Sequence, residues 1–93
     1  MCSYIYSNPI DGFDWDDANI DHISRHRVEP AEVEEAFAGR HLVMRSWEGR
    51  KVLLGRSAAG RYLIVAFIVR DDIVRVITAR TMNTAERRRF RRN

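Results

Sequence analysis

Positions 62–70 read YLIVAFIVR, a nearly continuous apolar run in a chain of 93 residues. The run is long enough for a strand and far short of the roughly 20 residues that a membrane-crossing helix needs. Apolar residues at consecutive positions predict a central strand covered on both faces. Because a chain of this length buries enough surface for one core only, we expect a single domain over residues 13–93.

Three more segments have strand character. Residues 41–46 and 50–55 are separated by a short connection, 47–49, that contains a glycine. Residues 73–80 follow the run at 62–70 after only two residues, Asp71 and Asp72, which suits a tight hairpin. The expected sheet is therefore a four-strand antiparallel meander.

Two helices are expected before the sheet. Asp16 is a good N-cap for the first, which runs to about Arg25. Pro30 suits the first position of the second, and Gly39 ends it. The side chains expected to face inward are Ile20, Ile23, Val33, Ala36 and Phe37.

A short helix is expected after the sheet, with Asn83 as N-cap and Glu86 three residues later. Residues 1–12 predict an irregular arm, because Asn8-Pro9 and Asp11-Gly12 are turn pairs. Two N-terminal helices, a meander and a C-terminal helix together predict an α+β fold.

The charge is unevenly distributed along the chain. Residues 1–36 hold nine acidic residues and two arginines, whereas residues 37–93 hold fourteen basic and four acidic residues. Fifteen of the sixteen bases are arginine, whose guanidinium grips phosphate oxygens in a bidentate way. The basic half points to nucleic acid as the partner, although ordinary solvated arginines in an arginine-rich composition explain the same pattern.

The single cysteine, Cys2, has no second cysteine to pair with, which suits a reducing cytosol. No signal peptide or membrane span is apparent. We therefore expect a cytoplasmic protein without a membrane partner.

Known catalytic motifs are largely absent. Cys2 and Ser57 lack the surroundings of a nucleophile, and no phosphate-binding glycine loop occurs. His22 and His26 have the spacing of two ligands on one helix face, but zinc needs at least a third ligand, so no metal site is predicted. For His22 we favour a structural role, in which it caps the helix end or bonds to the sheet. His26, at the helix–loop junction, is the better functional candidate.

Two arginines in the last predicted strand are the most informative residues. Alternation puts Arg75 on the face of Ile73 and Ile77, and Arg80 on the opposite face. An arginine in an apolar strand needs a partner or a ligand. For Arg75 the structural alternative is a salt bridge to an acidic helix residue such as Glu32 or Glu35.

Further basic residues are candidates for contacts to an RNA backbone. The final helix either binds RNA with its arginines or only solubilises the chain. The RNA-binding candidates are Arg50, Lys51, Arg56, Arg61, Arg87, Arg88 and Arg91. Phosphate contacts of this kind carry no base information.

Three stretches, taken in order, resemble a known family. They are WDDANIDHISRHRVEPAEVEEAF, GRKVLLGRSAAGRYLIVAF and VRVITARTMNTAERRRF, and together they span about residues 13–92. In this order they are similar to the BrnT-like toxins of type II toxin–antitoxin systems.

The resemblance implies a RelE-like fold, metal-independent ribonuclease activity that arrests translation, no cofactor, and an antitoxin partner. It assigns catalytic roles to His26, to the strand arginines Arg75 and Arg80, and to Glu86. Two departures bear on activity: Arg27 stands where the family usually has glycine, and Phe90 where it often has tyrosine.

RNA cleavage by the neighbouring 2′-hydroxyl needs a proton acceptor, a proton donor and stabilisation of the phosphorane charge. His26 or Glu86 is predicted to transfer protons, and Arg75 and Arg80 to bind the developing charge. The alternatives are a non-catalytic module that binds RNA or protein through the same arginines, and a structural adaptor with an exposed apolar sheet face. Without its antitoxin, the chain is expected to self-associate.

Overall fold

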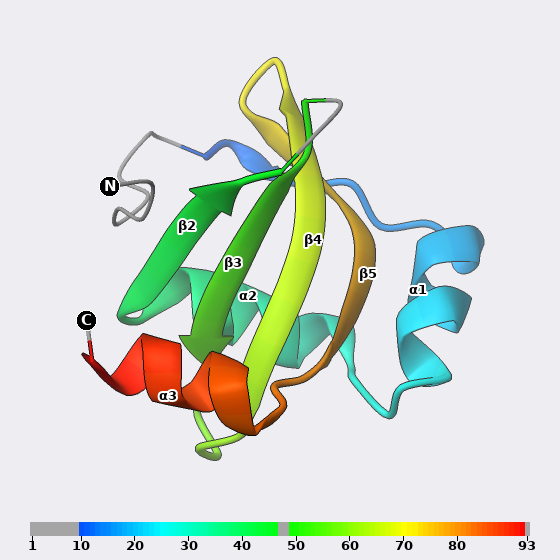
Figure 1. Cartoon of the computed structure of the whole chain (residues 1–93). Coiled ribbons are helices and arrows are strands. Elements are labelled where there is room, and N and C mark those ends of the chain that lie inside the picture. The colour runs from blue at the N-terminus through cyan, green and yellow to red at the C-terminus, as the bar shows by residue number, and fades with distance from the viewer. Residues whose placement is uncertain (1–9, 47–48, 93) are drawn as a thin grey trace.

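The computed structural model describes residues 10–46 and 49–92, and Figure 1 shows a single sheet with helices on both sides. The elements in chain order are β1 (Gly12–Phe13), α1 (Asp17–Ser24), α2 (Pro30–Ala38), β2 (His41–Arg45), β3 (Lys51–Arg56), β4 (Tyr62–Arg70), β5 (Ile73–Thr81) and α3 (Thr84–Arg92). The predicted α+β class is confirmed.

The sheet has the strand order β1-β5-β4-β3-β2, with β4 in its centre. Strands β2 to β5 form the predicted antiparallel meander. The expectation of four antiparallel strands was wrong, because β1 adds a fifth strand parallel to β5, with Gly12 opposite Ile73. A two-residue strand has no alternation to detect, so only its docking against β5 reveals it.

The predicted N-terminal arm falls in two parts. Residues 1–9 lie outside the described residues. Residues 10–12 run along the sheet, where the backbone N–H of Asp11 donates to the carbonyl of Asp72 at 2.8 Å.

The hairpin between β4 and β5 is as tight as predicted. Asp71 and Asp72 both have positive φ, 54° and 63°, which is the conformation of a two-residue type I′ turn. Residues 47–48, in the predicted β2–β3 connection, lie outside the described residues.

All three helices begin where their capping residues predict. The carboxylate of Asp16 accepts from the backbone N–H of Asn19 at 2.9 Å, and the Asn19 side chain accepts from the N–H of Asp16 at 2.9 Å. Ile23 is fully buried, but Ile20 is 37% exposed, so its inward orientation was wrong. Helix α1 lies beside β5 in Figure 1. Its buried residues are Asn19 and Ile23, so it buries only a narrow stripe.

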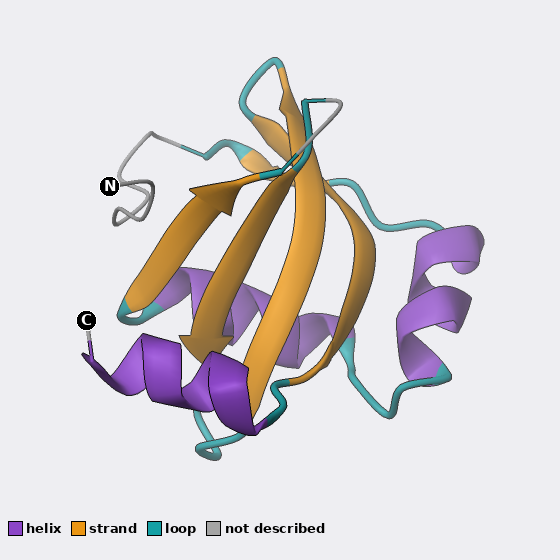
Figure 2. Ribbon diagram, in the orientation of Figure 1, coloured by secondary structure: helices purple, strands orange, loops and turns teal. Residues whose placement is uncertain are grey.

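Helices α1 and α2 cover one face of the sheet. The main hydrophobic core lies between these helices and the sheet. It includes Ile23, Val33, Ala36, Phe37, Val43, Leu53, Leu63, Val65, Phe67, Val74, Val76 and Ala79. On the opposite face a smaller cluster of Leu42, Leu54, Met82 and Phe90 packs beneath α3. Figure 2 shows that α3 crosses only one end of this face.

We call the face that carries α3 the open face. Beyond α3 it presents Met44, Val52, Ala66, Ile68, Arg75, Thr78 and Arg80, as the strand registers show. On one face of β4, Leu63, Val65 and Phe67 are buried, whereas the residues of the other face are at most half-buried, so the predicted cover on both faces is only partly confirmed.

Candidate functional site

A β-bulge in β5 brings the two strand arginines to the same face. Ala66 lies opposite Thr78, and the next residue, Phe67, lies opposite Val76, which leaves Ile77 as the extra residue. The bulge resets the alternation of β5. Arg75 and Arg80 then lie opposite Ile68 and Ile64, two residues of the same face of β4, so the predicted placement on opposite faces was wrong.

Arg80 forms a two-pronged ion pair with Glu86. Its Nη1 and Nη2 atoms lie 2.9 and 2.8 Å from Oε1 and Oε2 of Glu86. The same carboxylate accepts from the backbone N–H of Asn83 at 2.9 Å, so it also caps α3. The hydrogen bonds from Arg80 lower the pKa of Glu86 below its usual 4.5. Glu86 is therefore ionised at neutral pH, and Arg80 is held in one orientation.

Arg75 is ion-paired with the segment that leads into α1. Its Nη1 lies 3.2 Å from a carboxylate oxygen of Asp14, and its Nη2 lies 2.9 Å from one of Asp16. The pKa of Asp16 is lowered, first by the hydrogen bond from the Asn19 backbone and then by Arg75. The structural alternative for Arg75 is thus realised with Asp14 and Asp16 instead of Glu32 or Glu35.

His22 of α1 contacts β5, and His26 lies in the turn that follows the helix. The Nε2 atom of His22 lies 3.1 Å from the hydroxyl of Thr78, so the predicted bond from His22 to the sheet is confirmed. The rings of His22 and His26 are 5.8 Å apart between centroids. Both residues are exposed.

Helix α1 and strand β5 run in the same direction. The side chain of Asn19 donates to the carbonyl of Val76, and His22 contacts Thr78 further along both elements. Figure 1 shows α1 following β5 in this direction, and His26 lies in the turn after Ser24, the last residue of α1.

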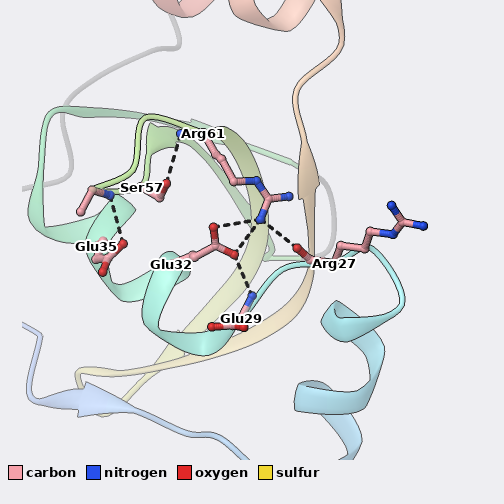
Figure 3. Close-up of polar contacts among 7 residues, drawn as sticks. Arg27, Glu29, Glu32, Glu35, Ser57 and Arg61 are labelled. Atoms are coloured by element: carbon pink, nitrogen blue, oxygen red, sulfur yellow. Dashed lines mark hydrogen bonds and ion pairs between the residues drawn. The ribbon is translucent and has the colours of Figure 1, made fainter.

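Arg61, one of the RNA-binding candidates, is engaged inside the protein. Its Nη1 lies 2.8 Å from both carboxylate oxygens of Glu32 and 2.8 Å from the carbonyl of Arg27 (Figure 3). These bonds tie the β3–β4 turn to the loop between α1 and α2. Arg61 is therefore committed to holding the fold together.

Other candidates lie on or beside α3. The guanidinium groups of Arg56 and Arg87 lie 4.8 and 5.7 Å from the ring centroid of Tyr62. The exposed arginines of α3 border a hollow of about 470 Å³, lined by Thr84, Arg87, Arg88, Arg91 and Arg92. Arg50 and Lys51 lie near the start of β3. They line neither this hollow nor the groove at the ends of α2 and α3.

A further groove lies where α2 and α3 end. It has a volume of about 890 Å³. The residues that line it are Glu35, Ala38, Gly39, Arg40, Arg56, Ser57, Ala58, Gly60, Tyr62, Phe90 and Arg91. Arg40 and Tyr62 were not among the predicted site residues, because no local pattern connects residues from three separate segments.

The described residues contain no group of three or more histidine, cysteine, aspartate or glutamate side chains arranged to hold a metal ion. Within the same residues, no helix has the length and apolar character needed to cross a membrane.

A family model described as ribonuclease toxin, BrnT, of type II toxin-antitoxin system matches residues 15–86. The matched part holds His26, Arg75, Arg80 and Glu86. No curated protein and no solved structure matches the chain.

Proposed function

Because the chain belongs to the BrnT family of ribonuclease toxins of type II toxin–antitoxin systems, we propose that it cleaves RNA on the open face, beside the Arg80–Glu86 pair. The observation that carries this proposal is the bulge at Ile77, which gathers Arg75, Arg80 and Thr78 on one face, where Thr78 contacts His22 of α1. The reaction needs cationic groups that stabilise the charge on the phosphate, and it needs groups that accept and donate protons.

In the proposed reaction, the 2′-hydroxyl attacks the adjacent phosphorus atom and the 5′-oxygen leaves. Arg80 donates hydrogen bonds to the phosphate oxygens as negative charge builds up on them. Glu86 positions Arg80, because its carboxylate accepts from both guanidinium nitrogens and its lowered pKa disfavours a role as proton donor.

We assign the proton transfers to the histidines. His22 contacts Thr78, which lies on the same face of β5 as Arg80, and the ring of His26 lies 5.8 Å from that of His22 between centroids. Imidazole exchanges protons near neutral pH, so one ring accepts the 2′-hydroxyl proton and one ring donates to the 5′-oxygen. This chemistry requires no metal ion, and we propose that cleavage persists in the presence of a chelator.

The test is cleavage of a defined RNA by the purified protein. Arg80→Ala is expected to reduce kcat by about 100-fold to 1,000-fold, because one donor to the transition state is lost. His26→Ala is expected to abolish cleavage while RNA affinity changes little. Arg70→Ala, which removes an exposed arginine at the far end of β4, is the control for loss of charge.

The products identify the mechanism. A terminal 2′,3′-cyclic phosphate is expected, because the attacking oxygen belongs to the RNA. If the wild-type protein binds RNA but leaves it intact, the non-catalytic module is the correct interpretation and the catalytic assignment fails.

A type II toxin family implies an antitoxin partner. We propose that the antitoxin covers the open face, where half-buried apolar side chains border the arginines. Growth arrest is then expected when the chain is expressed alone, and relief when the antitoxin is co-expressed.

A further inference from the structure

We propose that the groove between the ends of α2 and α3 binds a second stretch of the single-stranded RNA backbone, separate from the cleavage site. The inference rests on the proposed function but concerns how the substrate is held. The groove has none of its lining residues in common with the hollow beside Arg80, which is lined by Val52, Ile64, Ala66, Thr78 and Arg80.

The groove is positively charged. Arg40, Arg56 and Arg91 reach it from three different segments of the chain. Its one carboxylate, that of Glu35, is occupied by the backbone N–H of Ala58 at 3.0 Å. Neither Arg56 nor Arg91 forms an ion pair with any described residue. An anionic ligand would therefore meet uncompensated positive charge.

Two of these guanidinium groups are held in place by aromatic rings. Arg40 lies 4.4 Å from the centroid of Phe90, and its Nη2 donates to the carbonyl of Phe90 at 3.0 Å. Arg56 lies 4.8 Å from the centroid of Tyr62. A guanidinium stacked on a ring keeps its N–H donors at its edge, so less side-chain entropy is lost when an anion binds.

Gly60 keeps space for Arg56. Its φ is +93°, and a Cβ atom at this position would lie 3.1 Å from Nη2 of Arg56. A side chain at this position would therefore be strained by the backbone and would push the guanidinium of Arg56 aside. The bond between Arg61 and Glu32 ties the β3–β4 turn to α2 (Figure 3).

RNA backbone is the anion that fits best, because α3 links the two sites. Glu86 stands in the first turn of α3, and Phe90 and Arg91 stand in its last turns. A nine-residue helix is about 13 Å long, and Arg87 and Arg88 lie exposed between its ends. An RNA strand that is cleaved beside Arg80 can therefore follow the arginines of α3 to the groove. A single strand of about 4–16 nucleotides is the usual length for such backbone-following sites.

The experiment uses a fluorescent single-stranded RNA of this length with 2′-O-methyl groups, which binds but lacks the attacking hydroxyl. The double variant Arg56→Gln/Arg91→Gln is compared with Arg45→Gln/Arg70→Gln, which removes the same charge from exposed positions at the other end of the sheet. We expect the groove variant to bind about tenfold more weakly and its salt dependence to fall by a slope of about 1.4, for two lost phosphate contacts. The control is expected to change affinity less than twofold.

Photo-crosslinking of a thiouridine-containing RNA, mapped by mass spectrometry, locates the contact. A crosslink at Tyr62 supports the groove. Equal binding by the groove and control variants, or crosslinks confined to the open face, would overturn the proposal. So would a loss of antitoxin binding with RNA binding unchanged, which assigns the groove to the protein partner.

The two proposals fail in different ways. Absence of cleavage by the wild-type protein removes the proposed function, yet binding of the uncleavable RNA still reports on the groove. Cleavage that depends on Arg80, together with unaltered binding by the groove variant, removes only the groove.

Discussion

At the level of single residues, both departures from the family pattern lie at structural positions. Arg27 has a φ of 60°, in the left-handed region that favours glycine. Its carbonyl accepts from Arg61, and its side chain points away from this network in Figure 3. Phe90 is 3% exposed, and its ring contacts that of Tyr62 at 6.0 Å. Neither residue is part of the Arg80–Glu86 site, so neither departure argues against activity.

The backbone conformation of Arg27 leads to a prediction about stability. Arg27→Gly is expected to raise the free energy of unfolding by about 1 kcal/mol, because the left-handed conformation strains a residue with a Cβ atom by 1–2 kcal/mol and glycine loses part of that gain as unfolded-state entropy. Urea denaturation followed by circular dichroism measures the change. Arg25→Gly, in the αR conformation at the end of α1, is the control and is expected to destabilise the protein. A destabilising effect of Arg27→Gly would contradict the assignment of strain.

At the level of elements, side chains form hydrogen bonds with backbone groups at a strand edge and at helix ends. Within the part of the chain that the structure describes, no strand pairs with the outer edge of β5 beyond β1, and the side chain of Asn19 donates to the carbonyl of Val76 there at 3.3 Å. The same Asn19 caps α1. Glu86 has a comparable double role, because it caps α3 and holds Arg80 on β5. The start of α3 and the proposed cleavage site therefore depend on the same carboxylate.

This double role predicts a pH dependence. The folded-state pKa of Glu86 is lowered, so its ionised form stabilises the fold above about pH 4.5, and this stabilisation is lost as the pH falls through the folded-state value. The destabilisation caused by Glu86→Gln is therefore expected to be largest near neutral pH and to shrink under acid conditions. Chemical denaturation of both proteins from about pH 7 down to pH 3 tests this. The control is Glu34→Gln, because the carboxylate of Glu34 is exposed and accepts a hydrogen bond from the side chain of Trp15. A Glu86→Gln effect that is constant with pH would rule out the ionised carboxylate as its cause.

At the level of the whole molecule, the fold partly neutralises the uneven charge of the sequence. Acidic residues of the N-terminal part pair with arginines from the basic part, as in Glu32–Arg61, Asp14–Arg75 and Asp16–Arg75. No such ion pair among the described residues involves the groove arginines Arg56 and Arg91 or the α3 residues Arg87, Arg88 and Arg92. Arg89, also on α3, has a further interaction of its own. The basic surface that remains is therefore concentrated around α3.

The open face is also expected to govern self-association. Without the antitoxin, its half-buried apolar side chains favour contact between two copies, so the apparent mass of the isolated protein should rise with concentration in light scattering. Ala66→Lys, in the middle of this face, is expected to keep the protein monomeric, whereas Ala59→Lys in the exposed β3–β4 turn is expected to have no effect. A wild-type protein that stays monomeric over a wide concentration range would contradict this.

The sequence by itself determined the helices, the four long strands and the tight turn. Capping residues such as Asp16 and Asn83, the apolar run at 62–70 and the pair Asp71–Asp72 act over a few residues, so their signals survive without knowledge of the rest of the chain. The family pattern likewise identified Arg80 and Glu86, six residues apart, which form an ion pair. Their catalytic roles remain a proposal.

Only the tertiary structure decided which side chains meet. The bulge at Ile77 reverses the face of Arg75 relative to Arg80, and alternation along one strand gives no sign of it. Arg75 pairs with Asp14 across 61 positions, and Arg61 pairs with Glu32 across 29. The groove likewise joins three segments. Such contacts depend on how distant parts of the chain pack together, and a local pattern carries no information about that packing.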